Sequence, residues 1–188
     1  MNKRVILISF LLIIGYLISL ETTNHSLLNT ILLSYSERNF SSKPVSDTDI
    51  KTILQAGVQA PSARNSQLWH FTVVRDKELI KKVLRSSIEG NVLIVVSGSE
   101  VEQRGVNVVF DSALATQNMN ITAQFLGYGT RIYGSPIKNI NDNLKTDLEI
   151  PENYKAISVL RIGNIETDSE IKTSASPRKS LDEVVNYK

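Results

Sequence analysis

The chain has 188 residues, of which 41% are hydrophobic and 21% are charged, a composition typical of one globular domain with an ordinary core. Its 21 basic residues are interspersed with 19 acidic ones and leave a formal net charge of +2, which gives no support to a nucleic-acid-binding role. Cysteine is absent and histidine occurs only twice, so disulfides, thiolate zinc sites and Cys–His catalysis are excluded. Demanding chemistry would therefore have to come from a cofactor.

Residues 1–23 are predicted to be an N-terminal signal or membrane-anchor segment. Lys3 and Arg4 precede an uncharged, mostly aliphatic run, 5–20, which Glu21 closes. The length of this run falls between that of an export signal and that of a membrane span, and no small-residue cleavage pattern follows it. We therefore favour an uncleaved membrane tether over a cleaved signal, and both over a buried helix of the domain. The protein would be membrane-anchored or exported, with its body facing outward rather than cytoplasmic.

The rest of the chain, residues 24–188, is expected to form one domain in which helical and strand patterns alternate. Apolar residues recur at helical spacing in four segments: 27–35, 46–58, 77–87 and 106–126. Short runs rich in β-branched residues predict three strands: 69–74, 92–96 and 156–162. This order predicts an α+β fold with layers of helices and sheet.

The segment 106–126 is the longest predicted helix, and Gly127 ends it. Its apolar positions share the period of a core helix: Val109, Ala113, Leu114, Ile121 and Phe125. Many of its other residues are small or carry amides, which suits close packing against a second subunit as well as against its own sheet. We expect this helix at a dimer interface. The tail after Thr167 has few apolar residues until Leu181 and needs something to pack on.

A polar loop between a predicted helix and a predicted strand is the most informative part of the sequence. After Pro61 come Ser62, Asn65 and Gln67, together with Arg64 and Ser66, before the strand begins. Their hydroxyl and amide groups can meet a flat heterocycle that is rich in donors and acceptors. The aromatic residues of the strand, Trp69 and Phe71, are interpreted as core residues, and His70 between them as an ordinary strand residue.

Three separated segments, in the right order, resemble those of the FMN-dependent nitroreductase family, and the resemblance covers about residues 27–188. The segments are Ser36-Glu37-Arg38-Asn39-Phe40, the loop 61–71 and the closing segment 177–185. A fourth, softer match runs from Leu126 to Gly134. The resemblance implies a nitroreductase-like mixed antiparallel sheet flanked by helices, in a homodimer whose C-terminal tails cross onto the partner.

The resemblance also implies which residues bind FMN. Ser36 and Arg38 would meet the ribityl, phosphate or pyrimidine side of the cofactor, and Arg178 would hold its phosphate. Three residues of the polar loop would lie against the ring system: Ser62, Asn65 and Gln67. The turn at Tyr133 and Gly134 would bring a backbone N–H toward flavin N5. Guanidinium groups suit a phosphate, although a lone arginine is more often an ordinary surface residue.

The chain departs from the family pattern at several positions. Ser34 and Ser176 stand where the family commonly has basic residues, and Leu68 stands where proline is usual. The turn region 127–134 is about one residue short, and the region before the long helix is compact. The lost positive charge on the phosphate side could be replaced by one of three basic residues: Lys179, Arg64 or Arg131.

The resemblance implies an FMN-dependent oxidoreductase that passes reducing equivalents from NAD(P)H to a nitroaromatic, a quinone or a similar small acceptor. The flavin would perform the chemistry, so no side chain is assigned as catalytic and no metal is expected. Relatives that cleave flavin or remove halogen would need extra substrate-capping segments. The alternative from another class is a degenerate, membrane-tethered flavin-binding or interaction protein without turnover.

Overall fold

The computed structural model describes residues 27–101, 103–168 and 175–188. The chain forms two compact units, residues 1–34 and 35–188. In the described part of the first unit, residues 27–32 are helical, within the predicted helix 27–35. The predicted signal or anchor segment, 1–23, lies outside the described residues.

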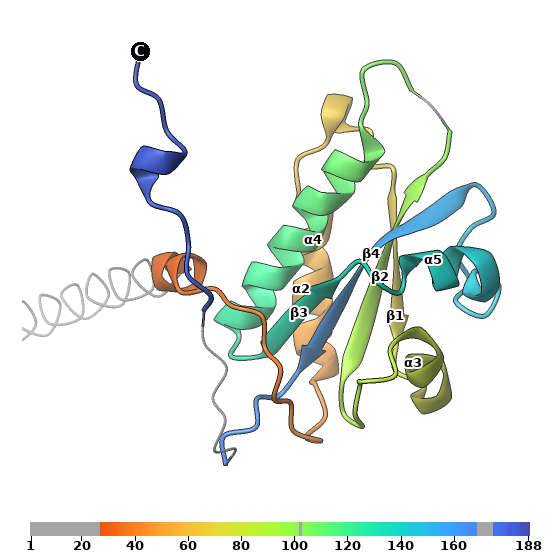
Figure 1. The fold of residues 1–188 in the computed structure, drawn as a ribbon. Helices are drawn as coiled ribbons and strands as arrows, with labels where there is room; N and C mark the ends of the chain where they lie inside the picture. Colours follow the sequence, from red (N-terminus) through yellow and green to blue (C-terminus); the bar gives the residue numbers. More distant parts are fainter. Residues whose placement is uncertain (1–26, 102, 169–174) are drawn as a thin grey trace, which may run out of the picture. The chain divides into compact units, whose positions relative to one another are not determined.

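Four antiparallel strands form the sheet of the second unit (Figure 1). They are β1 (Trp69–Val74), β2 (Val92–Ser99), β3 (Gly129–Tyr133) and β4 (Tyr154–Gly163), and their order across the sheet is β1-β2-β4-β3. Every residue of β2 is buried, which explains its unbroken apolar run from Val92 to Val96. The outermost strands, β1 and β3, form the two edges.

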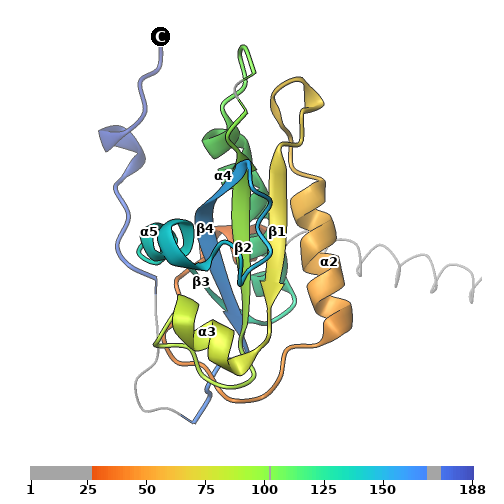
Figure 2. The ribbon, with the colours of Figure 1, turned by 90° about the vertical axis from the view of Figure 1, so that its right-hand side faces the viewer.

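Helices cover both faces of this sheet (Figures 1 and 2). On one face lie α2 (Asp47–Val58) and α4 (Val108–Phe125), and on the other lie α3 (Lys77–Val83) and α5 (Ile137–Asn139), which continues into a helical turn at Ile140–Leu144. Successive residues of β2 point to opposite faces: Ile94 packs with Met119 of α4, and Leu93 packs with Ile80 of α3. This architecture confirms the predicted α+β fold, whereas a single chain does not test the predicted homodimer.

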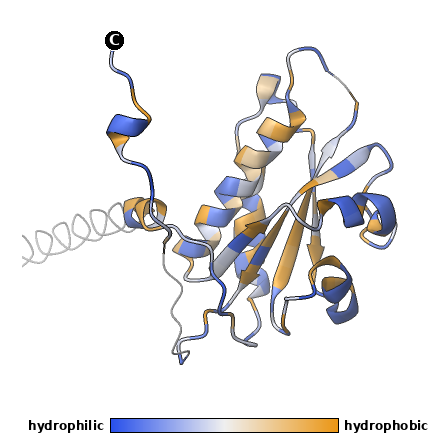
Figure 3. Ribbon diagram, in the orientation of Figure 1, coloured by the Kyte–Doolittle hydropathy of each residue, from blue (hydrophilic) through white to orange (hydrophobic). Residues whose placement is uncertain are grey.

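The helix starts follow the polar residues that precede them. Ser46, the first residue of the predicted helix 46–58, caps α2 by accepting a hydrogen bond from the N–H of Asp49, and Asp76 and Asn107 cap α3 and α4 in the same way. Gly127, with φ of +88°, follows the end of α4. Apolar residues concentrate on the inner strands in Figure 3, where the core lies between the two helical layers.

The face of α4 that packs on the sheet differs from the predicted one. Its buried residues are Asp111, Ser112, Ala115, Thr116, Met119, Asn120 and Ala123. Small side chains let the helix lie close to the sheet, and the hydroxyls of Thr116 and Ser158 lie 2.9 Å apart across this contact. The predicted core positions Val109, Ala113 and Phe125 are instead exposed. These apolar residues therefore recur at helical spacing as predicted, but they form an exposed apolar stripe on α4 and not its core face.

Two further elements were not predicted. The segment 127–134 was interpreted as a turn, yet residues 129–133 form the edge strand β3, paired with β4. The helical stretch from α5 to residue 144 also has no counterpart among the predicted elements. Both were missed because their exposed positions interrupt the apolar pattern on which the assignments rested.

The described residues contain no helix that combines the length and the apolar character needed to cross a membrane. The predicted membrane-anchored or exported location is contradicted, and the described residues give no support to the predicted membrane tether. The run 5–20, on which that prediction was based, lies outside the described residues.

Two glycines with positive φ provide a test of how the segment after Phe40 packs. A Cβ at Gly90 (φ +81°) would collide with the backbone carbonyl of Ser42, whereas a Cβ at Gly127 (φ +88°) would meet nothing within 4 Å. G127A should therefore lower the free energy of unfolding by only about 1 kcal/mol, from backbone strain, and G90A by about 3 kcal/mol or more. Urea denaturation measures the free energy of unfolding of each variant. Equal decreases in the two variants would show that the backbone of residues 42–43 moves to accept the added Cβ at little cost.

Candidate functional site

The segment carrying Ser36 and Arg38 runs beside the edge strand β3. The backbone N–H of Glu37 donates to the carbonyl of Thr130 at 2.8 Å, and Phe40, which is buried, forms a bridge with Ile165. Ser36 and Arg38 are both exposed, on either side of the buried Glu37. The start of β3 and the end of β4 therefore hold both predicted residues at one edge of the sheet.

A buried carboxylate within this segment was not singled out from the sequence. Glu37 is 2% exposed, and its Oε1 accepts the backbone N–H groups of Arg38 and Asn39, each at 2.8 Å. The hydroxyl of Tyr35 donates to Oε2 at 3.0 Å. Burial, followed by this hydrogen bond, raises the pKa of the Tyr35 hydroxyl. A glutamate next to an arginine in sequence gives no signal of such burial.

Tyr133 and Gly134 lie at the opposite end of the same strand. Tyr133 is three positions after Thr130 in an extended strand, so these two residues are about 10 Å apart. Gly134 is exposed, and a Cβ at this position would meet nothing within 4 Å. One edge strand thus lines up four of the predicted site residues: Ser36 and Arg38 at its start, and Tyr133 and Gly134 at its end.

Two further arginines face each other across the β3–β4 pairing. Arg161 of β4 is 4% exposed, its Nε donates to Asn91 at 2.7 Å, and its guanidinium carbon lies 3.9 Å from the centre of the Phe40 ring. Burial lowers the pKa of the Arg161 guanidinium. Its partner in the register is Arg131 of β3, whose guanidinium lies 4.9 Å from the Tyr133 ring centre. Of the three basic residues considered as replacements, Arg131 is thus the one next to the Ser36–Arg38 segment.

The polar loop before β1 has a strained backbone. Arg64, Asn65 and Gln67 all have positive φ, at 57°, 55° and 48°. Such conformations cost on the order of 1 kcal/mol or more for residues other than glycine and gather at functional sites. Ser62 accepts the backbone N–H of Gln67 at 3.1 Å, and the Gln67 amide donates to the carbonyl of Asn65 at 3.2 Å. The three predicted ring contacts therefore belong to one compact, internally bonded turn.

A second buried carboxylate holds this loop in place. Asp111, in the first turn of α4, is 3% exposed, and its Oδ2 accepts the backbone N–H of Ala63 at 3.1 Å. Beside this contact lies a mostly apolar hollow of about 400 Å³, whose lining includes Ser62, Phe110 and Leu114. Phe110 is 60% exposed there. The loop is thereby fixed to the N-terminal end of α4.

The two groups of predicted residues lie at opposite ends of α4. The amide of Gln124 donates to the carbonyl of Tyr35 at 3.1 Å, so the Ser36–Arg38 segment lies near the C-terminal end of the helix. Asp111, which holds the loop, is thirteen residues earlier, about 20 Å along the axis. Figure 1 shows the loop before β1 beyond the other end of α4. A single chain therefore does not bring Arg38 and Asn65 together.

Arg178 lies in the C-terminal segment 175–188, where every residue but Val185 is exposed. Its guanidinium donates to the carbonyl of Ser176 at 2.7 Å. A capping box between Ser180 and Glu183 shapes the following turn. Among the described residues, no contact joins Arg178 to the other predicted site residues. Its predicted role is untested by this chain alone.

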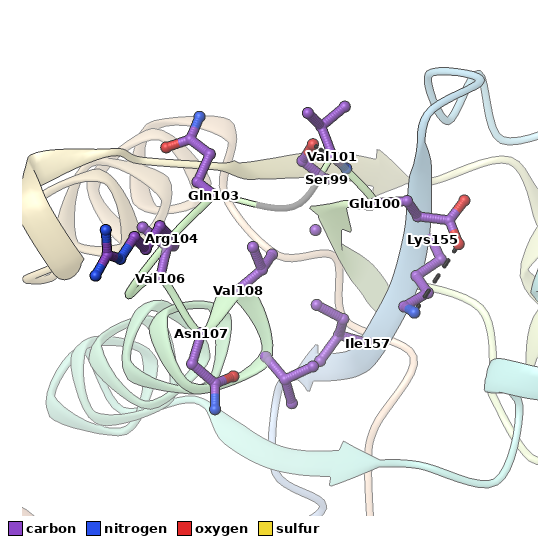
Figure 4. A pocket seen from close by; sticks show the side chains of 12 residues that line it. Ser99, Glu100, Val101, Gln103, Arg104, Val106, Asn107, Val108, Lys155 and Ile157 are labelled. Carbon is purple, nitrogen blue, oxygen red and sulfur yellow. Dashed lines mark hydrogen bonds and ion pairs between the residues drawn. The ribbon is translucent and has the colours of Figure 1, made fainter.

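A larger pocket, of about 630 Å³, lies elsewhere (Figure 4). It lies between the end of β2, the loop before α4 and the start of β4, and an ion pair between Lys155 and Glu100, 3.9 Å apart, flanks it. None of the predicted site residues lines it. Among the described residues, no group of three or more histidine, aspartate or glutamate side chains could hold a metal ion.

Solved structures share this arrangement of sheet and helices. A structure from Desulfovibrio desulfuricans, described as a nitroreductase in complex with FMN, matches with a TM-score of 0.72 and 26% identity, over 86% of this chain and 96% of its own. A structure from Clostridium acetobutylicum, provisionally called an NADH oxidase, matches with a TM-score of 0.70 and 28% identity, over 86% and 99%. The fold is therefore that of nitroreductase-type proteins, some of which contain FMN.

Sequence comparison identifies the family. A protein of Archaeoglobus fulgidus, with the provisional name NADH dehydrogenase/NAD(P)H nitroreductase, is 35% identical over 145 residues, covering 72% of this chain and 83% of that protein. A Staphylococcus aureus protein named NADPH-dependent oxidoreductase is 24% identical over 185 residues, covering 85% and 72%. The model of the nitroreductase family matches residues 34–103. The chain belongs to the nitroreductase family, which confirms the resemblance noted in its sequence.

Replacing Asp111 tests whether it fixes the polar loop. D111A removes a charged acceptor from the Ala63 N–H, so it should lower the free energy of unfolding by about 2 kcal/mol and speed amide exchange at residues 61–67. D111N retains an oxygen that can accept this bond and should cost less than half as much. Hydrogen-exchange mass spectrometry measures the loop directly. Unchanged exchange in D111A would show that the loop keeps its shape without this carboxylate.

Proposed function

We propose that this protein is an FMN-dependent oxidoreductase that uses NAD(P)H to reduce a small acceptor such as a nitroaromatic compound or a quinone. Its membership of the nitroreductase family supports this function, as do the names of its relatives. The structural observation that carries the proposal is the alignment of Ser36 and Arg38 with Tyr133 and Gly134 along β3. In this proposal the start of that strand would receive the phosphate of a flavin and its end would receive the ring.

The chemistry of these groups fits FMN. The guanidinium of Arg38 and the hydroxyl of Ser36 would bind the phosphate or the ribityl chain, because a guanidinium pairs well with phosphate oxygens. The exposed backbone at Tyr133 and Gly134 would present an N–H toward flavin N5, and the absence of a side chain on Gly134 permits close approach. When bound, the flavin would supply the hydride and electron chemistry.

A second subunit would complete the site. Ser62, Asn65 and Gln67 lie too far along α4 to reach the flavin held by Arg38 of the same chain, so we assign them to the flavin of the partner. The exposed apolar stripe of α4 supports this dimer, since Val109, Phe110 and Phe125 are between 41% and 60% exposed. Arg178 would reach a flavin phosphate on a C-terminal tail that crosses onto the partner.

The protein groups in this proposal bind and orient, and none acts as an acid or a base. Positive charge from Arg38, Arg131 and Arg161 near the flavin would favour its anionic reduced form. Arg161 is well suited to this effect because burial in the sheet limits screening of its charge. The strained polar loop would offer amide groups to the ring edge without rearrangement.

The visible spectrum of the purified full-length protein tests the function. The proposal predicts a yellow protein, or a colourless one that turns yellow on addition of FMN, whose absorbance bleaches on addition of NADH or NADPH and returns with a quinone. A yellow protein that neither pyridine nucleotide bleaches would instead indicate a flavin-binding protein without turnover. A protein that does not bind added FMN would contradict both the proposed oxidoreductase and the flavin-binding protein without turnover.

Mixed dimers test whether two subunits share the site. R38A and N65A should each lose most FMN binding when expressed alone. When the two variants are unfolded and refolded together, random pairing should restore FMN binding to about a quarter of the wild-type sites, because half of the dimers combine an intact Arg38 with an intact Asn65 across the interface. Equilibrium dialysis counts the sites. No recovery in verified mixed dimers would place both residues in the site of one subunit.

A further inference from the structure

We infer that Glu37 is a positioning residue for the phosphate end of the flavin: its buried carboxylate shapes the backbone that presents Ser36 and Arg38. This inference rests on the proposed function. It assigns a role to a residue that would not itself touch the cofactor. The evidence comes from the contacts of Glu37 on three sides.

The first contact is with the backbone that follows Glu37. The N–H groups of Arg38 and Asn39 both converge on Oε1, at 2.8 Å each. Bonds from two successive N–H groups to one carboxylate oxygen determine how the chain turns directly after Glu37. They therefore determine the direction in which the Arg38 side chain leaves the backbone.

The other contacts fix the carboxylate itself. Tyr35 donates its hydroxyl to Oε2 at 3.0 Å, and the Glu37 N–H donates to Thr130 of β3 at 2.8 Å. Gly129 makes room for the side chain, because a Cβ at this position would lie 2.6 Å from Cγ of Glu37. The aliphatic part of Glu37 thus packs against backbone where a side chain would otherwise lie.

A role limited to holding the fold would not require a carboxylate at this position. Phe40, which is 7% exposed and bridges to Ile165, already anchors the segment to the end of β4. Burying a charged group is unfavourable unless hydrogen bonds compensate it. Here the compensating N–H groups include that of the residue whose guanidinium is proposed to bind phosphate. The contacts of Glu37 are thus concentrated where they orient Arg38.

Riboflavin, which lacks the phosphate, separates a positioning role from a general structural one. Dissociation constants for FMN and riboflavin would be measured by flavin fluorescence with the full chain, for the wild type, E37Q and D49N. E37Q should raise the dissociation constant for FMN about tenfold and change that for riboflavin by less than about twofold. D49N is the matched control, because it removes another carboxylate that a tyrosine hydroxyl contacts, that of Asp49 with Tyr128 at 2.6 Å. It should leave both constants unchanged.

Two further variants make the test independent of the folding of E37Q. G129A retains the carboxylate but displaces it, and it should cause the same selective loss of FMN. The double variant E37Q/R38A should bind FMN no more weakly than R38A alone, since Glu37 acts through Arg38. Thermal melting without flavin reports the folding of each variant.

The outcomes distinguish this inference from the proposed function. Equal losses of FMN and riboflavin in E37Q and G129A, or additive losses in the double variant, would overturn the positioning role and leave the proposed function standing. A wild-type protein that binds neither flavin would overturn the proposed function, and the role of Glu37 with it.

Discussion

The close packing of α4 on the sheet is the constraint on which the rest of the structure depends. Ser112, Ala115 and Thr116 bring the helix axis near the strands, and Met119 reaches from it into the core that α2 shares. This leaves the larger apolar residues of α4 exposed and separates the two predicted parts of the site by most of the helix length. Under the proposed function, the same packing would provide both a surface for a second subunit and the reason that a complete site would require one.

Each part of the proposed site is held by a carboxylate that would not touch the cofactor. Glu37 accepts backbone N–H groups in the Ser36–Arg38 segment, and Asp111 accepts one in the polar loop. Because these bonds are buried, they are stronger than their exposed equivalents. Binding groups can then remain at the surface while the backbone that carries them is fixed from within.

Sequence predicted the elements whose patterns reflect burial directly. The strand 69–74 was found with its observed bounds because an aromatic and β-branched run follows a polar loop, and the helix 46–58 was found because its apolar residues recur at helical spacing. Strand β3 was missed because its five residues include a glycine and an arginine and give no run of β-branched or apolar side chains. Glu37, Asp111 and Arg161 were missed because a charged residue in a sequence carries no mark of the partners that compensate its burial. The roles assigned to the site residues stay predictions, because they depend on groups beyond one chain.

The left-handed backbone at Arg64, Asn65 and Gln67 has a consequence for the speed of recognition. Folding itself imposes these conformations, so under the proposed function an incoming flavin would meet amides already arrayed for contact, and its binding would cost little conformational freedom of the protein. The rate of capture should then be governed by diffusion and by the width of the entrance. Variants that relax the turn would slow capture even where every contacting side chain is retained.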